Sequence, residues 1–204
     1  MSMNAGFHPF VWFCRVLLRL VGWRILLPPT LAAKAVVMIY PHTSNWDFIL
    51  GILFRYGSGL PIHWAAKDSL FRGLPGVFFR AMGGVPVNRR ERTGFVEQMA
   101  ANYANHERFY LGITPEGTRS TVDHLKSGFY RLARAIDVPL ALACIDYARR
   151  EVGIFGLYET TGDEAADLAA LAAAYRGRRG KYPAQQGPFV FIDMDQAWRE
   201  RGGV

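Results

Sequence analysis

The amino-acid sequence predicts an α/β fold with a mostly parallel central sheet that is flanked by helices. Short apolar runs rich in β-branched residues alternate with longer segments of helical periodicity, the pattern expected of a parallel sheet with helices on both faces. Half of the 204 residues are hydrophobic and a fifth are charged, which suits a globular domain with a sizeable core. No internal repeat, low-complexity tract or long linker interrupts the alternation.

Six apolar runs are expected to form strands, and each has the length of a buried strand. They cover residues 35–40, 61–66, 84–87, 109–114, 139–147 and 151–158. The expected helices between and after them cover residues 47–56, 74–82, 95–106, 126–136 and 163–175. Glycines close the first of these helices, and Thr161 is expected to cap the last. In such a fold the active site tends to lie where strands end and helices begin.

Residues 7–27 form the one segment that is apolar enough to touch a membrane. The segment is long enough to span a bilayer, but Arg15, Arg19 and Arg24 interrupt it. A central arginine in a lone spanning helix costs about 2.5 kcal/mol or more. Arg15 and Arg19 share a helix face, and tryptophans stand toward both ends. The pattern favours an amphipathic helix lying on the membrane surface, with packing on the protein's own core as the alternative.

We therefore expect two parts in the chain. Residues 1–29 would be the membrane-docking helix, ended by the Pro-Pro pair at 28–29, and residues 30–204 would be the α/β domain. A signal peptide is not expected, because no lysine or arginine precedes the apolar stretch and arginines break it.

The net charge of the chain favours anionic partners. The formal charge is +7 and the sequence pI is about 9.7, which suits nucleic acid, anionic lipid or phosphorylated substrates. Basic residues are dispersed and no base-stacking module is recognisable, so we expect no nucleic-acid role. One cluster of basic residues has two possible interpretations. It would bind anionic lipid headgroups or an acidic carrier protein, or it would form a solvated loop. It consists of Arg176, Arg178, Arg179 and Lys181.

A histidine and an aspartate flank the turn between the first predicted strand and the helix that follows it. His42 comes directly after the strand, and Asp47 opens the helix. In a continuous strand or helix, residues at this spacing point to different faces, whereas a turn can fold the histidine back onto the aspartate. The pair would then work as a base and the carboxylate that orients it.

His63 and Asp68 have the same spacing, so the spacing alone is weak evidence. His63 lies inside a predicted strand, and Asp68 is not expected to reach it, so we interpret His63 as a structural histidine. The sequence contains no Gly-x-Ser-x-Gly, Ser-x-x-Lys, His-Glu-x-x-His or phosphate-loop motif. Ser44 lies too close to His42 in the turn to be a convincing nucleophile. A base without a protein nucleophile implies that a bound substrate hydroxyl supplies the nucleophile.

Two further segments at strand ends carry groups that suit a phosphate. Residues 115–120 read Pro-Glu-Gly-Thr-Arg-Ser. There Gly117 permits close approach of the backbone, Thr118 offers a hydroxyl and Arg119 offers a planar fork of donors. Residues 83–90 read Gly-Gly-Val-Pro-Val-Asn-Arg-Arg and end in cationic groups. Taken alone, an ordinary polar turn and solvated charges would also explain these segments.

Together these segments resemble the motifs of the glycerolipid acyltransferases, the lysophosphatidic acid acyltransferases and their relatives. The matched motifs, in chain order, are His42 with Asp47, Gly83 with Arg89, residues 115–120, and Val-Pro at residues 138–139. Their order and spacing agree with that family over residues 35–147, and residues 175–183 resemble the tail segment of its short bacterial members. Three features depart from it: Pro41, Thr114 and the lack of a second proline in the fourth motif. These departures leave the acceptor open.

The resemblance implies transfer of a fatty acyl chain from an acyl thioester to the hydroxyl of a lysophospholipid-like acceptor. Acyl-CoA or acyl carrier protein would supply the chain, with no metal and no further cofactor. His42 would be the catalytic base and Asp47 would fix its imidazole. The implied substrate-binding residues are Arg89, Glu116, Gly117, Thr118, Arg119, Lys67 and Lys126.

The resemblance also implies a monotopic protein on the phospholipid surface, at the cytoplasmic face of the cell membrane. Two alternatives stay open. One is a thioesterase, in which water replaces the acceptor, and the other is a non-catalytic lipid-binding protein of the same fold. The sequence sets neither the acceptor lipid, nor the carrier of the donor, nor the chain length.

Overall fold

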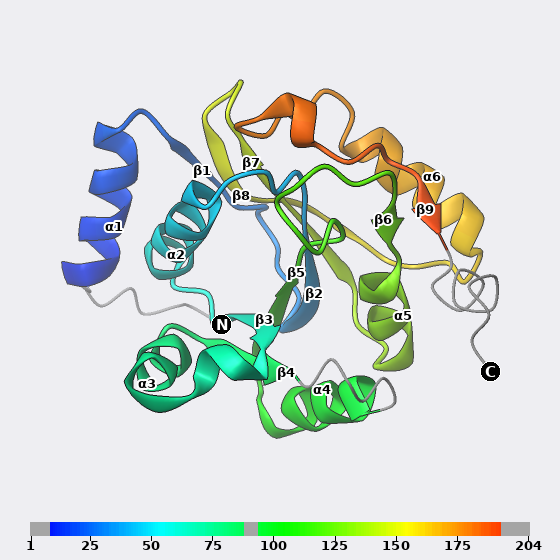
Figure 1. Cartoon of the computed structure of the whole chain (residues 1–204), viewed down its shortest axis with the longest axis horizontal. Helices are drawn as coiled ribbons and strands as arrows, with labels where there is room; N and C mark the ends of the chain where they lie inside the picture. Colours follow the sequence, from blue (N-terminus) through cyan, green and yellow to red (C-terminus); the bar gives the residue numbers. More distant parts are fainter. Residues whose placement is uncertain (1–8, 88–93, 193–204) are drawn as a thin grey trace.

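The computed structural model describes residues 9–87 and 94–192, which form a seven-stranded sheet with helices on both faces (Figure 1). The strands lie in the order β1-β8-β7-β2-β5-β3-β4. Their bounds are β1 (Arg24–Leu26), β2 (Lys34–Ile39), β3 (Ile62–Lys67), β4 (Gly84–Val87), β5 (Phe109–Ile113), β7 (Leu140–Asp146) and β8 (Glu151–Tyr158). A separate parallel pair joins β6 (Leu125–Lys126) to β9 (Phe191–Ile192).

The helices appear close to the positions that the sequence predicts. They are α1 (Pro9–Leu20), α2 (Trp46–Ser58), α3 (Gly73–Ala81), α4 (Gly94–Asn105), α5 (Gly128–Ala135) and α6 (Glu164–Ala174). Short 3-10 turns lie at Asp68–Phe71 and Pro183–Gln185. α2 ends at Gly59 in the left-handed conformation, which glycine adopts without steric cost, as the glycine signal predicts.

Most strand pairs in the main sheet are parallel, as predicted. β2 pairs in parallel with both β5 and β7, with Met38 opposite Ile113 and Ile39 opposite Ala143. In the part of the chain that the structure describes, β7 and β8 form the one antiparallel pair of this sheet. The strands β2, β3, β4, β5 and β7 therefore end at the same edge, and the loops that follow β2, β3, β5 and β7 begin there.

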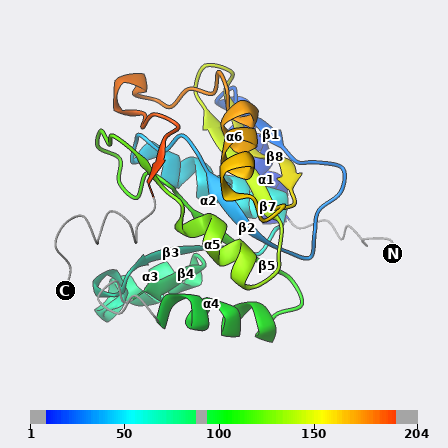
Figure 2. The ribbon, with the colours of Figure 1, turned by 90° about the vertical axis from the view of Figure 1, so that its right-hand side faces the viewer.

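The sheet separates two apolar cores. Along β2, Val36 and Met38 face the core under α4, α5 and α6, whereas Ala35 and Val37 face the core under α1 and α2. This alternation has the period of two that a strand buried on both faces requires. Figure 2 shows α4, α5 and α6 on the near side of the sheet and α1 on the far side.

The N-terminal helix is shorter than predicted. α1 ends at Leu20, Gly22 takes a φ of 80°, and β1 then joins the edge of the sheet beside β8. The Arg24 guanidinium also pairs with Glu151, 127 residues later, at 2.7 Å. The prediction of a helix through residue 27 is therefore wrong, because pairing with a distant strand overrides the local apolar pattern. None of the described helices has the length and apolar character needed to cross a bilayer.

The start of α6 also differs from the prediction. Asp163, and not Thr161, caps the helix, because its carboxylate accepts a backbone N–H of the first turn at 3.1 Å. Thr161 instead donates its hydroxyl to the buried carboxylate of Asp167 at 2.7 Å. Tyr130 and Tyr158 donate to the same carboxylate at 2.8 Å each. Burial alone would raise the pKa of Asp167, but these hydrogen bonds hold it at about 2.

Candidate active site

His42 and Asp47 lie at the carboxyl edge of the sheet, where β2 passes into α2. β2 ends at Ile39 and α2 begins at Trp46, so His42 falls in the turn and Asp47 in the first turn of the helix. The Nδ1 atom of His42 lies 3.1 Å from Oδ2 of Asp47. The turn therefore brings the two side chains together, although Nδ1 is not aligned for a hydrogen bond in this conformation.

The Asp47 carboxylate is buried and receives three hydrogen bonds. Its Oδ2 accepts the backbone N–H groups of Thr43 at 2.9 Å and Ser44 at 3.0 Å. Its Oδ1 accepts the hydroxyl of Tyr147 at 2.8 Å. Burial and then the bond to Asp47 raise the pKa of Tyr147, so the phenol stays protonated and remains a donor. The orientation of the carboxylate is thus fixed by the protein itself.

Tyr147 was not predicted from the sequence. It comes directly after β7, and its ring packs edge-on against Trp23 with 4.9 Å between ring centroids. Its partner Asp47 lies 100 residues earlier, so no local pattern marks the contact. The one available signal is topological, since a strand parallel to β2 delivers its following residue to the edge where His42 lies.

Glu116 joins the His42 turn to a distant part of the chain. It follows β5, and its Oε2 accepts the backbone N–H of His42 at 2.6 Å, while its Oε1 accepts the N–H of Gly187 at 3.3 Å. The residue is 2 % exposed. Burial raises the pKa of Glu116 to about 7 against the effect of these two bonds, and the charge of Asp47 raises it further. In this structure the carboxylate binds the protein's own backbone.

A polar hollow of about 350 Å³ lies beside the His42 turn. Three segments line it: the turn after β2, the loop after β5 and a segment near the C-terminus. The lining residues are Thr43, Ser44, Asn45, Trp46, Arg119, Ser120, Tyr182 and Gln185. No carboxylate is among them, so the lining is neutral or cationic. Its polarity and size suit a small anionic group.

The other predicted substrate-binding residues are distributed along the same edge. Gly117 has a φ of 67°, and the Lys126 ammonium packs so close that a Cβ at residue 117 would lie 3.0 Å from its Nζ. Thr118 is exposed in the same turn. Lys67 ends β3 and is exposed. Arg89 lies outside the described residues.

His63 lies within β3, as predicted. Its ring stacks on Phe109 at 4.4 Å between centroids, and burial lowers the pKa of His63, so the ring is held neutral. Asp68 lies beyond the strand, with its carboxylate 3.8 Å from the guanidinium of Arg72. The spacing that His63 and Asp68 share with the first pair therefore produces no second pair.

The predicted basic cluster near the C-terminus is divided in the structure. Arg178 forms an ion pair with Glu151 at 2.6 Å, so its charge is neutralised and its assignment to a free positive patch is wrong. Arg176 and Arg179 are exposed, and Lys181 is partly buried.

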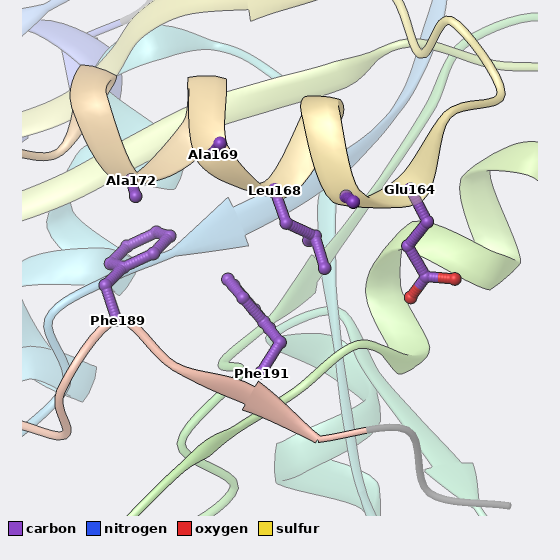
Figure 3. Close-up of a pocket in the computed structure, with 7 residues that line it drawn as sticks. Glu164, Leu168, Ala169, Ala172, Phe189 and Phe191 are labelled. Carbon is purple, nitrogen blue, oxygen red and sulfur yellow. The ribbon is translucent and has the colours of Figure 1, made fainter.

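A larger hollow, of about 510 Å³, lies between α6 and β9. Figure 3 shows Phe189 and Phe191 directed toward α6 across this hollow, with Glu164 at one end. Its lining is mostly alanine, leucine and phenylalanine, and contains no histidine or hydroxyl group. We therefore assign the candidate active site to the smaller polar hollow, which adjoins the turn that carries His42 and Asp47.

Comparisons with known proteins agree with this fold. The family model described as Acyltransferase matches residues 27–145, a range that contains the His42 turn and Glu116. Among solved structures, the chain is similar to the 1-acyl-sn-glycerophosphate (LPA) acyltransferase PlsC from Thermotoga maritima. The two are 16% identical with a TM-score of 0.51, over 85% of this chain and 80% of the other. No curated protein matches the chain.

Proposed function

Because the chain belongs to the acyltransferase family, we propose that it moves a fatty acyl chain from an acyl thioester to the hydroxyl of a lysophospholipid-like acceptor. Coenzyme A or acyl carrier protein would carry the thioester. The observation that carries the proposal is the 3.1 Å approach of His42 Nδ1 to Asp47 Oδ2, beside a hollow lined by polar and cationic side chains.

In the proposed reaction His42 is the base and Asp47 orients it. With Nδ1 turned toward Asp47, Nε2 is the ring nitrogen that can take the proton of the acceptor hydroxyl. The hydroxyl oxygen attacks the thioester carbonyl carbon as its proton passes to Nε2. The carbon–sulfur bond then breaks, and the leaving thiolate takes the proton back from His42. General-base catalysis of this kind contributes roughly 10²–10⁴-fold, and the proposal requires no metal or further cofactor.

Cationic groups along the same sheet edge would hold the acceptor phosphate. Arg119 lines the hollow, Lys126 packs against the neighbouring glycine turn, and Lys67 ends β3. Arg89 is assigned the same role from its motif alone. Glu116 would act indirectly, because its carboxylate holds the backbone of His42 in place through a 2.6 Å hydrogen bond.

We further propose that α1 binds the phospholipid surface on the cytoplasmic face of the membrane, where acyl-CoA and acyl carrier protein are found. Cys14 and Leu18 of α1 pack against the protein, while Phe10, Trp12 and Phe13 are each more than half exposed. A helix that buries one apolar side and exposes another to water suits an interface with lipid.

The test of the reaction is a thioester assay with His42→Ala and Asp47→Asn. Both variants are expected to lose acylation of lysophospholipids by at least about 100-fold, because one lacks the base and the other its orienting charge. His63→Ala removes a histidine of the same spacing that lies in β3, and should retain activity if it folds. Undiminished turnover in both site variants would refute the proposal. Release of free fatty acid without an acceptor would instead indicate a thioesterase.

A further inference from the structure

A segment of the chain outside the family match crosses both catalytic motifs. We call residues 180–187 the C-terminal strap. Near its start, the N–H of Tyr182 donates to the Thr43 hydroxyl at 3.1 Å. Gly180 packs so closely that a Cβ there would lie 2.5 Å from the same hydroxyl oxygen. A side chain at residue 180 would therefore displace the strap from the turn that carries His42.

The other end of the strap is bound to the Glu116 loop and to β2. The N–H of Gly187 donates to Glu116, and its carbonyl accepts the Tyr40 hydroxyl at 2.7 Å. The Gln186 amide donates to the Tyr40 oxygen at 3.0 Å. Both ends of the strap are thus fixed to residues of the catalytic motifs.

The middle of the strap bridges the two motifs directly. With its amide nitrogen turned toward the two carbonyls, Gln185 donates to the backbone oxygens of Thr43 and Arg119 at 3.1 Å each. Tyr182 and Gln185 also line the 350 Å³ hollow together with Arg119. The strap therefore forms one wall of the hollow, and the motifs form the other.

The charges around this hollow are positive. The Lys181 ammonium lies 5.2 Å from the ring centroid of Trp46 and 5.7 Å from that of Tyr182, and both rings line the hollow. Within residues 9–87 and 94–192, neither Lys181 nor Arg119 forms an ion pair with a carboxylate. Arg119 thus lines the hollow and Lys181 lies beside two of its lining rings, and such a pair of cations near hydroxyl and amide groups suits a phosphate.

We infer that the C-terminal strap completes the acceptor site, with Lys181 and Gln185 selecting acceptors that carry a phosphate group. This inference rests on the proposed acyl transfer, and it assigns the choice of acceptor to residues outside the family motifs. Arg119 and Lys181 would approach the phosphate from opposite walls of the hollow, while Gln185 keeps those walls at a fixed separation.

The test compares two soluble short-chain acceptors that differ only in the phosphate, a lysophosphatidate and the corresponding monoacylglycerol, below their micelle concentrations. Lys181→Gln is expected to raise the KM for lysophosphatidate about tenfold relative to the KM for monoacylglycerol, since one charge-assisted contact is lost. Gln185→Leu should likewise reduce the preference of the enzyme for lysophosphatidate over monoacylglycerol. Arg176→Gln, an exposed arginine outside the hollow, is the matched control and should keep it.

An unchanged preference in both strap variants would overturn the inference, and so would equal losses with both acceptors. A higher KM for the acyl thioester alone would also overturn it, since the strap would then serve the donor. Calorimetric titration with glycerol 3-phosphate and with inorganic phosphate separates the inference from acyl transfer. Binding of glycerol 3-phosphate that weakens in Lys181→Gln supports the site even if turnover is absent, whereas equal binding by wild type and variant overturns it. Equal affinity for the two probes would make the ligand a free phosphate and overturn the acceptor assignment.

Discussion

Tyr147 and Asp47 are joined by a hydrogen bond of 2.8 Å, although one follows the strand β7 and the other opens α2. Tyr147 donates to Oδ1 of the carboxylate, whereas Oδ2 is the oxygen that lies toward His42. Under the proposed mechanism the candidate pair extends to three residues: Tyr147 holds the Asp47 carboxylate, and that carboxylate would orient His42.

Tyr147→Phe is expected to lower kcat roughly tenfold, because a hydrogen bond to a charged group is lost while the ring and its contact with Trp23 remain. The KM for the acceptor should stay unchanged, since Tyr147 is not among the residues that line the hollow. Tyr158→Phe is the control: it removes a bond of the same length to Asp167 and should lower stability only. A wild-type kcat in Tyr147→Phe would contradict the proposed role of the tyrosine.

Glu116→Gln should remove a pH dependence of stability. The pKa of Glu116 is raised from 4.5 to about 7 in the folded protein, so the folded state holds this proton more tightly than the unfolded state. Ionising the buried carboxyl therefore costs stability as the pH rises from 4.5 through 7. Denaturant unfolding from pH 5 to pH 8 should show wild type losing roughly 2 kcal/mol relative to the variant. Parallel curves for the two proteins would show that the carboxyl does not titrate in this range.

Asp167→Asn is expected to lower the free energy of unfolding by about 2–4 kcal/mol at pH 7, because the amide places a donor among hydroxyl donors. The pKa of Asp167 is depressed from 3.8 to about 2, so its contribution is present above pH 3.8 and lost as the pH falls through 2. The difference in free energy of unfolding between the variant and the wild type should therefore become smaller as the pH is lowered. Asp163→Asn keeps a good helix cap and should change little.

Replacing Trp12 and Phe13 by serine should weaken binding of the protein to phospholipid vesicles at least about tenfold, because both exposed rings lose their apolar area. Co-sedimentation with vesicles of phosphatidylcholine and phosphatidylglycerol measures the change. Val190→Ser removes a comparably exposed apolar residue beside β9, on the side of the molecule away from α1 (Figure 1), and should bind as wild type. Equal binding by all three proteins would place the contact with lipid elsewhere.

Local patterns were sufficient to predict most of the fold. The parallel arrangement and the family resemblance are confirmed, because buried strands and glycine-terminated helices carry their signals within a few residues. β4 and β8 also have their predicted bounds. β1 was missed because three residues at a sheet edge depend on pairing with β8. The prediction that Thr161 caps α6 was wrong because the Thr161 hydroxyl donates to the carboxylate of Asp167 instead.

The candidate site was predictable only where its residues lie close together in the sequence. The strand–turn–helix signal predicted that His42 and Asp47 would meet, and they lie 3.1 Å apart. Tyr147 and the C-terminal strap contact the His42 turn and Asp47 from 100 and 139 residues away in the sequence, through contacts that depend on the order of strands in the sheet. Their roles in the reaction remain predictions for the assays above.

The strap and Tyr147 both lie beyond residue 145, where the family match ends. The turn that carries His42 and the loop that carries Arg119 lie inside the match, whereas the strap residues proposed to complete the acceptor site lie outside it, and these stretches of chain meet in one hollow. Under this arrangement, substitutions in residues 180–187 would change the choice of acceptor without any change in the turn between β2 and α2. An evolutionary change of substrate would then require no change in the chemistry.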